Sequence, residues 1–133
     1  MKNKRIIRCF IIIIFIIAGT LFYRKLSVHK HISNDDISSI QLWGVYIKQR
    51  EASKEEIQRI IEKFNSIKSI RRNKDFQGMT PDSGIIIDLK SGEHIIIIKS
   101  GMDFEIQRPV DGKQVSYWGK NKYIKDLLEE LSR

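Results

Sequence analysis

The sequence predicts an α+β protein, with an N-terminal transmembrane helix and then a small domain of mainly antiparallel sheet with two helices, in the order β-α-β-β-β-(β)-α. Three observations predict this class. Residues 9–23 form an uncharged apolar run. Residues 53–70 and 123–131 carry apolar side chains at helical spacing. Residues 84–108 alternate short apolar segments with Ser-Gly turns, as in a meander of strands.

Residues 9–23 begin and end beside cations, a pattern typical of a membrane segment. These fifteen residues measure about 22 Å as a helix, and counting from Ile6 gives about 27 Å, against a hydrocarbon core of about 30 Å. The length fits a spanning anchor or a secretory signal. Because further apolar residues follow the small cluster Ala18–Thr20, we expect an uncleaved anchor over residues 1–25, in contact with the lipid bilayer through residues 6–23.

The charges predict orientation and exclude one class of partner. Four cations precede the apolar run and two follow it directly, which favours a single-pass protein with a cytoplasmic N-terminus and an extracellular C-terminal domain. Residues 1–33 hold seven Lys/Arg and no acid, whereas residues 34–133 hold seventeen Lys/Arg and sixteen Asp/Glu. Residues 1–33 therefore carry seven of the eight net positive charges, residues 34–133 are close to neutral, and no nucleic-acid partner is expected.

Residues 26–36 are polar and predict a stalk. Residues 37–133 are long enough for one small extracytoplasmic domain with one core. The domain is expected to begin with a strand over residues 37–48, in which Gly44 interrupts the alternation.

Ser53-Lys54-Glu55-Glu56 is a capping box, in which the serine hydroxyl and the glutamate carboxylate satisfy the first amides of a helix. Apolar residues at helical spacing extend this predicted helix to the vicinity of Ile70. Residues 71–83 are then expected to form the longest loop, because Pro81 and the neighbouring Asp, Ser and Gly residues oppose a continued helix.

Three strands are expected over residues 84–90, 93–99 and 102–108. In the first and third, alternate positions are apolar and should face one core. For both apolar sets to face the same core, one hairpin must have a two-residue loop and the other a three-residue loop with a left-handed Gly. One or two isoleucines of the middle strand then point away from the core, where another element covers them or they form a small exposed apolar patch.

The last segments are a turn at Asp111-Gly112, a short strand over residues 113–118 and a C-terminal helix. Val115 and Tyr117 share one face of that strand. The helix carries an apolar stripe from Tyr123 to Leu131.

The basic cluster Arg71, Arg72 and Lys74 is the candidate binding site for an anion or a partner, since guanidinium and ammonium groups bind phosphate and carboxylate. A charged helix end explains the same residues and is the favoured interpretation. The large aromatic residues are candidates for a binding platform, although core or half-buried sheet positions are favoured for them; they are Trp43, Tyr46, Tyr117 and Trp118.

No catalytic, cofactor or metal site is predicted. His29 and His31 lie in the polar stalk, and a rigid metal site needs more ligands. The acid pairs at 35–36, 55–56 and 129–130 are better explained by solvation or helix electrostatics than by hydrolysis. No phosphate-binding loop, dinucleotide fingerprint or nucleophile elbow occurs in the sequence.

Three segments between residues 37 and 131 carry a resemblance. They are residues 53–64, the isoleucine-rich hairpin, and Phe104 to Gly112 with its Pro-Val-Asp-Gly turn leading to Tyr123 and Leu127-Leu128. In these positions the chain resembles a family of small exported or membrane-anchored proteins of Gram-positive bacteria, classified as a domain of unknown function. The resemblance implies an α+β domain outside the membrane and brings no catalytic residue. Gly44 and residues 71–74 depart from the pattern.

These features favour a non-enzymatic, membrane-anchored module of the cell envelope that binds an envelope protein or an anionic polymer. Twenty-six isoleucines with many lysines indicate an AT-rich genome and favour a low-GC Gram-positive source. Two alternatives remain. One is a small envelope hydrolase that uses an acid near the apolar patch, with Asp88, Glu93 and His94 as its residues. The other is an immunity or regulatory protein that acts within the membrane through the anchor.

Overall fold

The computed structural model describes residues 2–72, 80–101 and 103–133. It divides the chain into two compact units, Met1–Lys30 and His31–Arg133, and each is described by itself. The first unit is the helix α1 (Lys2–Val28). Its stretch Ile6–Tyr23 is long and apolar enough to cross a membrane, and every side chain in that stretch is exposed.

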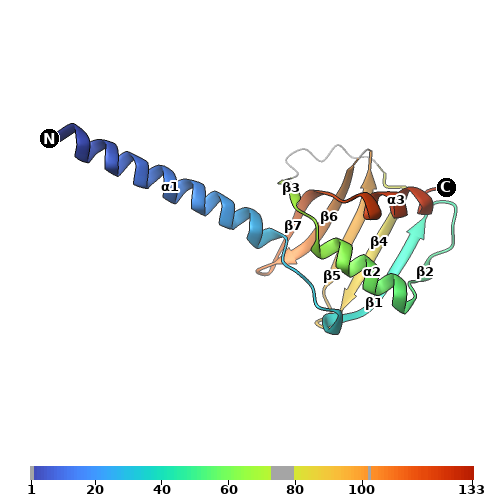
Figure 1. The fold of residues 1–133 in the computed structure, drawn as a ribbon. Coiled ribbons are helices and arrows are strands. Elements are labelled where there is room, and N and C mark those ends of the chain that lie inside the picture. The colour runs from blue at the N-terminus through green and yellow to red at the C-terminus, as the bar shows by residue number, and fades with distance from the viewer. Residues whose placement is uncertain (1, 73–79, 102) are drawn as a thin grey trace. The chain divides into compact units, whose positions relative to one another are not determined.

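The second unit is an antiparallel sheet of seven strands covered by two α-helices (Figure 1). The strands lie in the order β2-β1-β4-β5-β6-β7-β3. In chain order the elements are η1 (Asn34–Asp36), β1 (Ile37–Gly44), β2 (Arg50–Glu51), α2 (Lys54–Asn65), β3 (Ser69–Arg72), β4 (Ser83–Leu89), β5 (His94–Ser100), β6 (Asp103–Val110), β7 (Lys113–Lys120) and α3 (Lys122–Leu131). The predicted α+β class, with two helices against a mainly antiparallel sheet, is therefore confirmed.

The core lies between one face of the sheet and the two helices. Figure 1 shows α2 and α3 on the same side of the sheet, and α3 contacts β1, β4 and β5. Side chains alternate along a strand, so every second residue faces these helices. The fully buried residues on this face are mostly isoleucines: Ile40, Leu42, Ile85, Ile87, Ile95, Ile97, Phe104, Ile106 and Tyr117. We call it the helix face.

The capping box begins α2 as predicted: the Glu56 amide donates to the Ser53 hydroxyl, and the Ser53 amide donates to the Glu56 carboxylate. The helix ends at Asn65, five residues before the expected end. Ile70 belongs instead to β3, which pairs with β7 at the edge of the sheet. As a strand, this segment forms backbone hydrogen bonds with the edge of β7, which it could not form as part of a longer helix. This pairing with a distant strand overrides the helical spacing of its apolar residues.

The two hairpin loops have the lengths that were predicted. Between β4 and β5, Leu89 donates its amide to the Glu93 carbonyl, and the three-residue loop they enclose contains Gly92 with φ +88°. Between β5 and β6, Ser100 pairs with Asp103 across a two-residue loop. Both outer strands thereby direct their apolar sets to the helix face, and alternate isoleucines of β5 point the other way.

The folded unit begins six residues before the boundary expected at residue 37. Ile32 is buried, and the Asn65 side chain bonds both of its backbone groups: the Ile32 amide donates to Oδ1 at 2.9 Å, and Nδ2 donates to the Ile32 carbonyl at 2.8 Å. The last part of the expected stalk therefore packs against α2. The Asn65 carboxamide at the end of that helix bonds the backbone of Ile32 as a neighbouring strand would.

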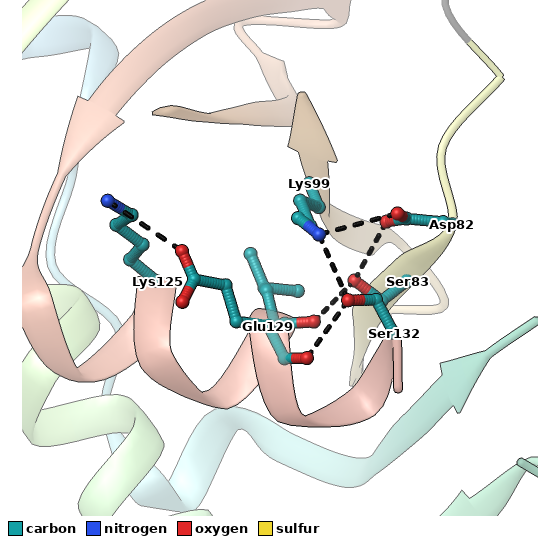
Figure 2. Close-up of polar contacts among 7 residues, drawn as sticks. Asp82, Ser83, Lys99, Lys125, Glu129 and Ser132 are labelled. Atoms are coloured by element: carbon teal, nitrogen blue, oxygen red, sulfur yellow. Dashed lines mark hydrogen bonds and ion pairs between the residues drawn. The ribbon is translucent and has the colours of Figure 1, made fainter. Parts of the chain in front are cut away.

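The end of α3 packs closely against the sheet and forms polar contacts with it. Figure 2 shows the polar contacts. A Cβ atom at Gly44 would overlap the Leu131 carbonyl, so only glycine admits the helix here. The buried Ser83 hydroxyl donates to the Leu128 carbonyl at 2.7 Å. Lys99 donates to Ser132 at 2.9 Å and pairs with Asp82 at 3.3 Å, which places a cation beside the C-terminus of α3.

Candidate binding surface

The sheet face opposite the helix face carries a continuous row of paired residues. It runs across five adjacent strands as Trp43 (β1), Gly84 (β4), Ile98 (β5), Glu105 (β6) and Trp118 (β7). We call this face the open face and these five residues the aromatic row. In the described part of this unit, α2 and α3 both lie on the helix face, and no helix covers the open face.

Trp43 leans across the neighbouring strand. A Cβ atom at Gly84 would lie 2.5 Å from Nε1 and 2.6 Å from Cε2 and Cζ2 of the indole. Those three atoms form one edge of the ring system, so that edge lies against Gly84 on the neighbouring strand. Glycine at position 84 thus makes room for the ring, and the indole of Trp43 stays half-buried at the surface.

Glu105 lies beside Trp118 with only 2% of its surface exposed. Its carboxylate accepts a hydrogen bond from the Ser116 hydroxyl and another from Gln107 Nε2 at 3.3 Å. These donors satisfy a buried carboxylate, which would otherwise carry a large desolvation cost. The position next to Trp118 in the aromatic row therefore holds a carboxylate that is already hydrogen-bonded within the sheet.

A second row runs parallel to the aromatic row, two residues away along each strand. It consists of Gln41, Ile86, Ile96, Gln107 and Ser116, paired across the same five strands. The amides and the hydroxyl stand at its two ends, and two half-buried isoleucines stand in the middle. Ile96 and Ile98 are the two isoleucines of the middle strand that were expected to point away from the core; Ile96 is half-buried, and Ile98 is buried.

Asp88 joins Ser39 and His94 at the far end of the open face. The Ser39 hydroxyl donates to Oδ2 of Asp88 at 2.7 Å, and Nδ1 of His94 lies 2.7 Å from Oδ1. The hydrogen bond from Ser39 first, and then that from His94, lower the pKa of Asp88. The serine and the imidazole bind separate carboxylate oxygens, so this trio differs from a nucleophile–base–orienter chain, in which the imidazole stands between the other two.

The predicted basic cluster is only partly described. Arg71 lies on β3 directly opposite Trp118, and its guanidinium pairs with Asp103 at 3.2 Å, which balances its charge. The backbone of Arg72 belongs to the same strand, opposite Tyr117. Lys74 and the Arg72 side chain lie outside the described residues. The prediction of a joint anion site therefore stays a prediction, with Arg71 placed at the end of the aromatic row.

The four aromatic candidates separate into three environments. Tyr117 is fully buried on the helix face, where burial raises its pKa to about 12 beside Arg108. Tyr46 is 77% exposed in the turn after β1. Trp43 and Trp118, which are seventy-five positions apart in the sequence, are the two that the sheet brings into one row.

A shallow pocket of about 200 Å³ lies on the other side of the sheet, beside η1. Lys90 and Asp36 line it together with Arg108, which is buried and stacks over the Phe64 ring at 5.9 Å. The opposite charges of Lys90 and Asp36 offset each other at its rim. This pocket is therefore a weaker candidate than the open face.

The remaining sequence candidates have structural positions of their own. Glu56 belongs to the capping box and to an ion pair with Arg50 at 2.7 Å, and these contacts lower its pKa to about 2. Glu129 pairs with Lys125 on α3 (Figure 2). Among the described residues, no group of three or more His, Cys, Asp or Glu side chains is arranged to hold a metal ion.

Sequence reasoning named both tryptophans as candidates for a binding platform but did not predict that they share one row across the sheet. The sequence did indicate the face of Trp118: Val115 and Tyr117 were assigned to one face of their strand, which places Trp118 on the other. Comparison with protein-family models, with curated proteins and with solved structures finds no match. The resemblance to the Gram-positive family therefore stays a prediction.

Proposed function

We propose that this chain is a membrane-anchored binding module of the cell envelope, non-enzymatic, which binds its partner through the open face. The observation that carries the proposal is the aromatic row, because indole rings at a surface offer apolar area together with a polar N–H group. Surface regions of this composition mark interaction sites more often than scattered single apolar residues do. The apolar stretch Ile6–Tyr23 of α1 supplies the anchor.

The proposed orientation follows from the cations that flank the apolar stretch, with the N-terminus in the cytoplasm and residues 31–133 outside. Protease added to intact cells should remove residues 31–133 and leave the N-terminal part protected and unprocessed. Full protection of residues 31–133 in intact cells, with digestion after lysis, would contradict the orientation.

The binding surface is tested by site-specific photo-crosslinking in cells. A photo-reactive amino acid at Ile96 on the open face should give a discrete adduct, because this position lies beside the aromatic row. The matched control is the same amino acid at Gln58, which is exposed on α2 on the other side of the sheet. Adducts from Gln58 without adducts from Ile96 would contradict the proposed surface.

The anchor is proposed to act as a tether. Exchange of residues 11–17 for an unrelated apolar helical segment of equal length should leave the Ile96 adduct unchanged. Loss of the adduct after this exchange, with the protein still in the membrane, would favour an immunity or regulatory protein that acts through the anchor.

A further inference from the structure

The open face offers aromatic rings and hydrogen-bonding groups beside two half-buried isoleucines, Ile86 and Ile96. Ile98, at the centre of the aromatic row, is only 8% exposed. Trp43 and Trp118 on either side are half-buried, so within the aromatic row the apolar area available to a ligand comes mainly from the two indoles. A protein interface usually needs a desolvated apolar centre. Here the centre of the row is a buried isoleucine next to a hydrogen-bonded carboxylate.

The two indoles are spaced for an extended ligand. They lie on β1 and β7, four strand spacings apart, which corresponds to about 19 Å between their backbones. Because the Trp43 ring leans one strand inward over Gly84, the rings themselves are closer, about 14 Å apart if Trp118 stands above its own strand. A single small molecule does not span this distance, whereas several units of an extended polymer do.

Hydrogen-bonding groups accompany the rings at a fixed offset. Gln41 and Ser116 lie two residues along the strand from Trp43 and Trp118, a shift of about 7 Å on the same face. Gln107 occupies the equivalent position beside Glu105. A ligand that rests on the indoles therefore meets carboxamide and hydroxyl groups along one side.

Two charged groups of the described residues, Glu105 in the row and Arg71 next to it, already have partners. The Glu105 carboxylate accepts hydrogen bonds from Ser116 and Gln107, and Arg71 pairs with Asp103. A polyanion would have to compete with Asp103 for that guanidinium. An uncharged polar ligand leaves that ion pair in place, and the Ser116 oxygen and the Gln107 carboxamide oxygen can accept from it while both side chains still donate to Glu105. This difference argues against the anionic polymer, one of the two partners that the sequence left open.

We infer that the open face binds an uncharged polysaccharide chain of the cell wall, with sugar rings resting on Trp43 and Trp118 and sugar hydroxyls bonded to Gln41, Gln107 and Ser116. A pyranose ring has an apolar C–H face, which packs on an indole, and hydroxyl groups around its rim. Aromatic rings and polar side chains in parallel rows match these two features. This inference rests on the proposed function, for which it names the class of partner.

The inference is tested with the full-length protein in zwitterionic detergent micelles, since a sugar-based detergent would compete. The probes are a cellulose hexasaccharide and an N-acetylglucosamine hexasaccharide. Binding is followed by tryptophan fluorescence, and both tryptophans of the chain lie in the aromatic row. We expect a saturable change with at least one probe, and loss of about tenfold in affinity for Trp43→Ala or Trp118→Ala, measured by calorimetry.

Two further variants separate the row from the rest of the surface. Tyr46→Ala removes an aromatic ring that is more exposed than either tryptophan but lies in the turn after β1, and affinity should stay unchanged. Gly84→Ala keeps both tryptophans but displaces the leaning Trp43 ring, and affinity should fall several-fold. Urea unfolding of each variant confirms that the domain is still folded.

Binding of neither hexasaccharide by the folded wild-type protein would overturn the inference, as would affinities that Trp43→Ala and Trp118→Ala leave unchanged. The proposed function fails separately, through the absence of an adduct from Ile96 in cells. An Ile96 adduct that contains a protein, together with no saccharide binding, would retain the proposed function and replace the polysaccharide by a protein partner.

Discussion

The two faces of the sheet are made from the same strands but differ in how tightly their residues are constrained. On the helix face, isoleucines are fully buried and α3 approaches so closely that Gly44 has no room for a methyl group. On the open face, Gly84 also has no room, but the obstacle there is the Trp43 ring, which can rotate. The close packing of the helix face therefore fixes the positions of the strands. The side chains of the open face keep their places along these strands but can still move to contact a ligand.

The largest expected effect comes from Gly44→Ala. The new Cβ would overlap the Leu131 carbonyl, and because backbone cannot yield locally, α3 must shift. We expect a loss of about 3 kcal/mol or more in the free energy of unfolding. Urea unfolding of the full-length protein in micelles, followed by tryptophan fluorescence, measures it.

Gly84→Ala is the matched control on the open face. The same added methyl group meets the edge of the Trp43 indole, which can move away, and the expected cost is less than about 1 kcal/mol. Equal losses for the two variants would contradict the proposed difference between the faces.

Adjacent isoleucines in β4 provide the next test, because Ile85 and Ile86 point to opposite faces. Ile85 is fully buried under the helices, so Ile85→Ala should cost about 3 kcal/mol through lost burial and a cavity. Ile86 is half-buried on the open face, and Ile86→Ala should cost about 1 kcal/mol. The same unfolding measurement applies, and the reverse order would place the core on the wrong face.

The smallest effect concerns the helix layer and depends on pH. The pKa of Glu56 is lowered to about 2 by the hydrogen bond from Arg50 first and then by the Ser53 amide. Because the unfolded chain titrates near 4.3, the charged form stabilises the fold above that pH, and this contribution disappears as pH falls toward 2. Glu56→Gln should therefore lower stability by less than about 1 kcal/mol at pH 6, and this difference from the wild type should shrink as the pH falls toward 2.

Glu62→Gln is the control for this titration. Glu62 lies on the same helix, but its carboxylate forms an exposed ion pair with the neighbouring Lys63 and takes no part in the capping box. Stability of this variant should follow the wild type across the pH range. A pH-independent loss in Glu56→Gln would show that the charge of Glu56 has no role.

Local patterns predicted the helix face well. The capping box at Ser53, the parity of the β4–β5–β6 hairpins and the stripe of α3 all depend on neighbours within a few residues. The open face depends on long-range pairing. Nothing in the sequence near Trp43 indicates that Trp118 lies in the same row, because that depends on the order of all the strands. The strand β3 was missed because it pairs with β7, which lies more than forty residues later in the sequence.

The central claim is that the open face is covered by a partner in the cell, and hydroxyl-radical footprinting of intact cells against purified protein tests it most directly. The indoles of Trp43 and Trp118 should be oxidised several-fold more slowly in cells than in the purified protein, while Tyr46, outside the aromatic row, reacts equally in both. Equal oxidation of the two tryptophans in cells and in the purified protein would contradict the account.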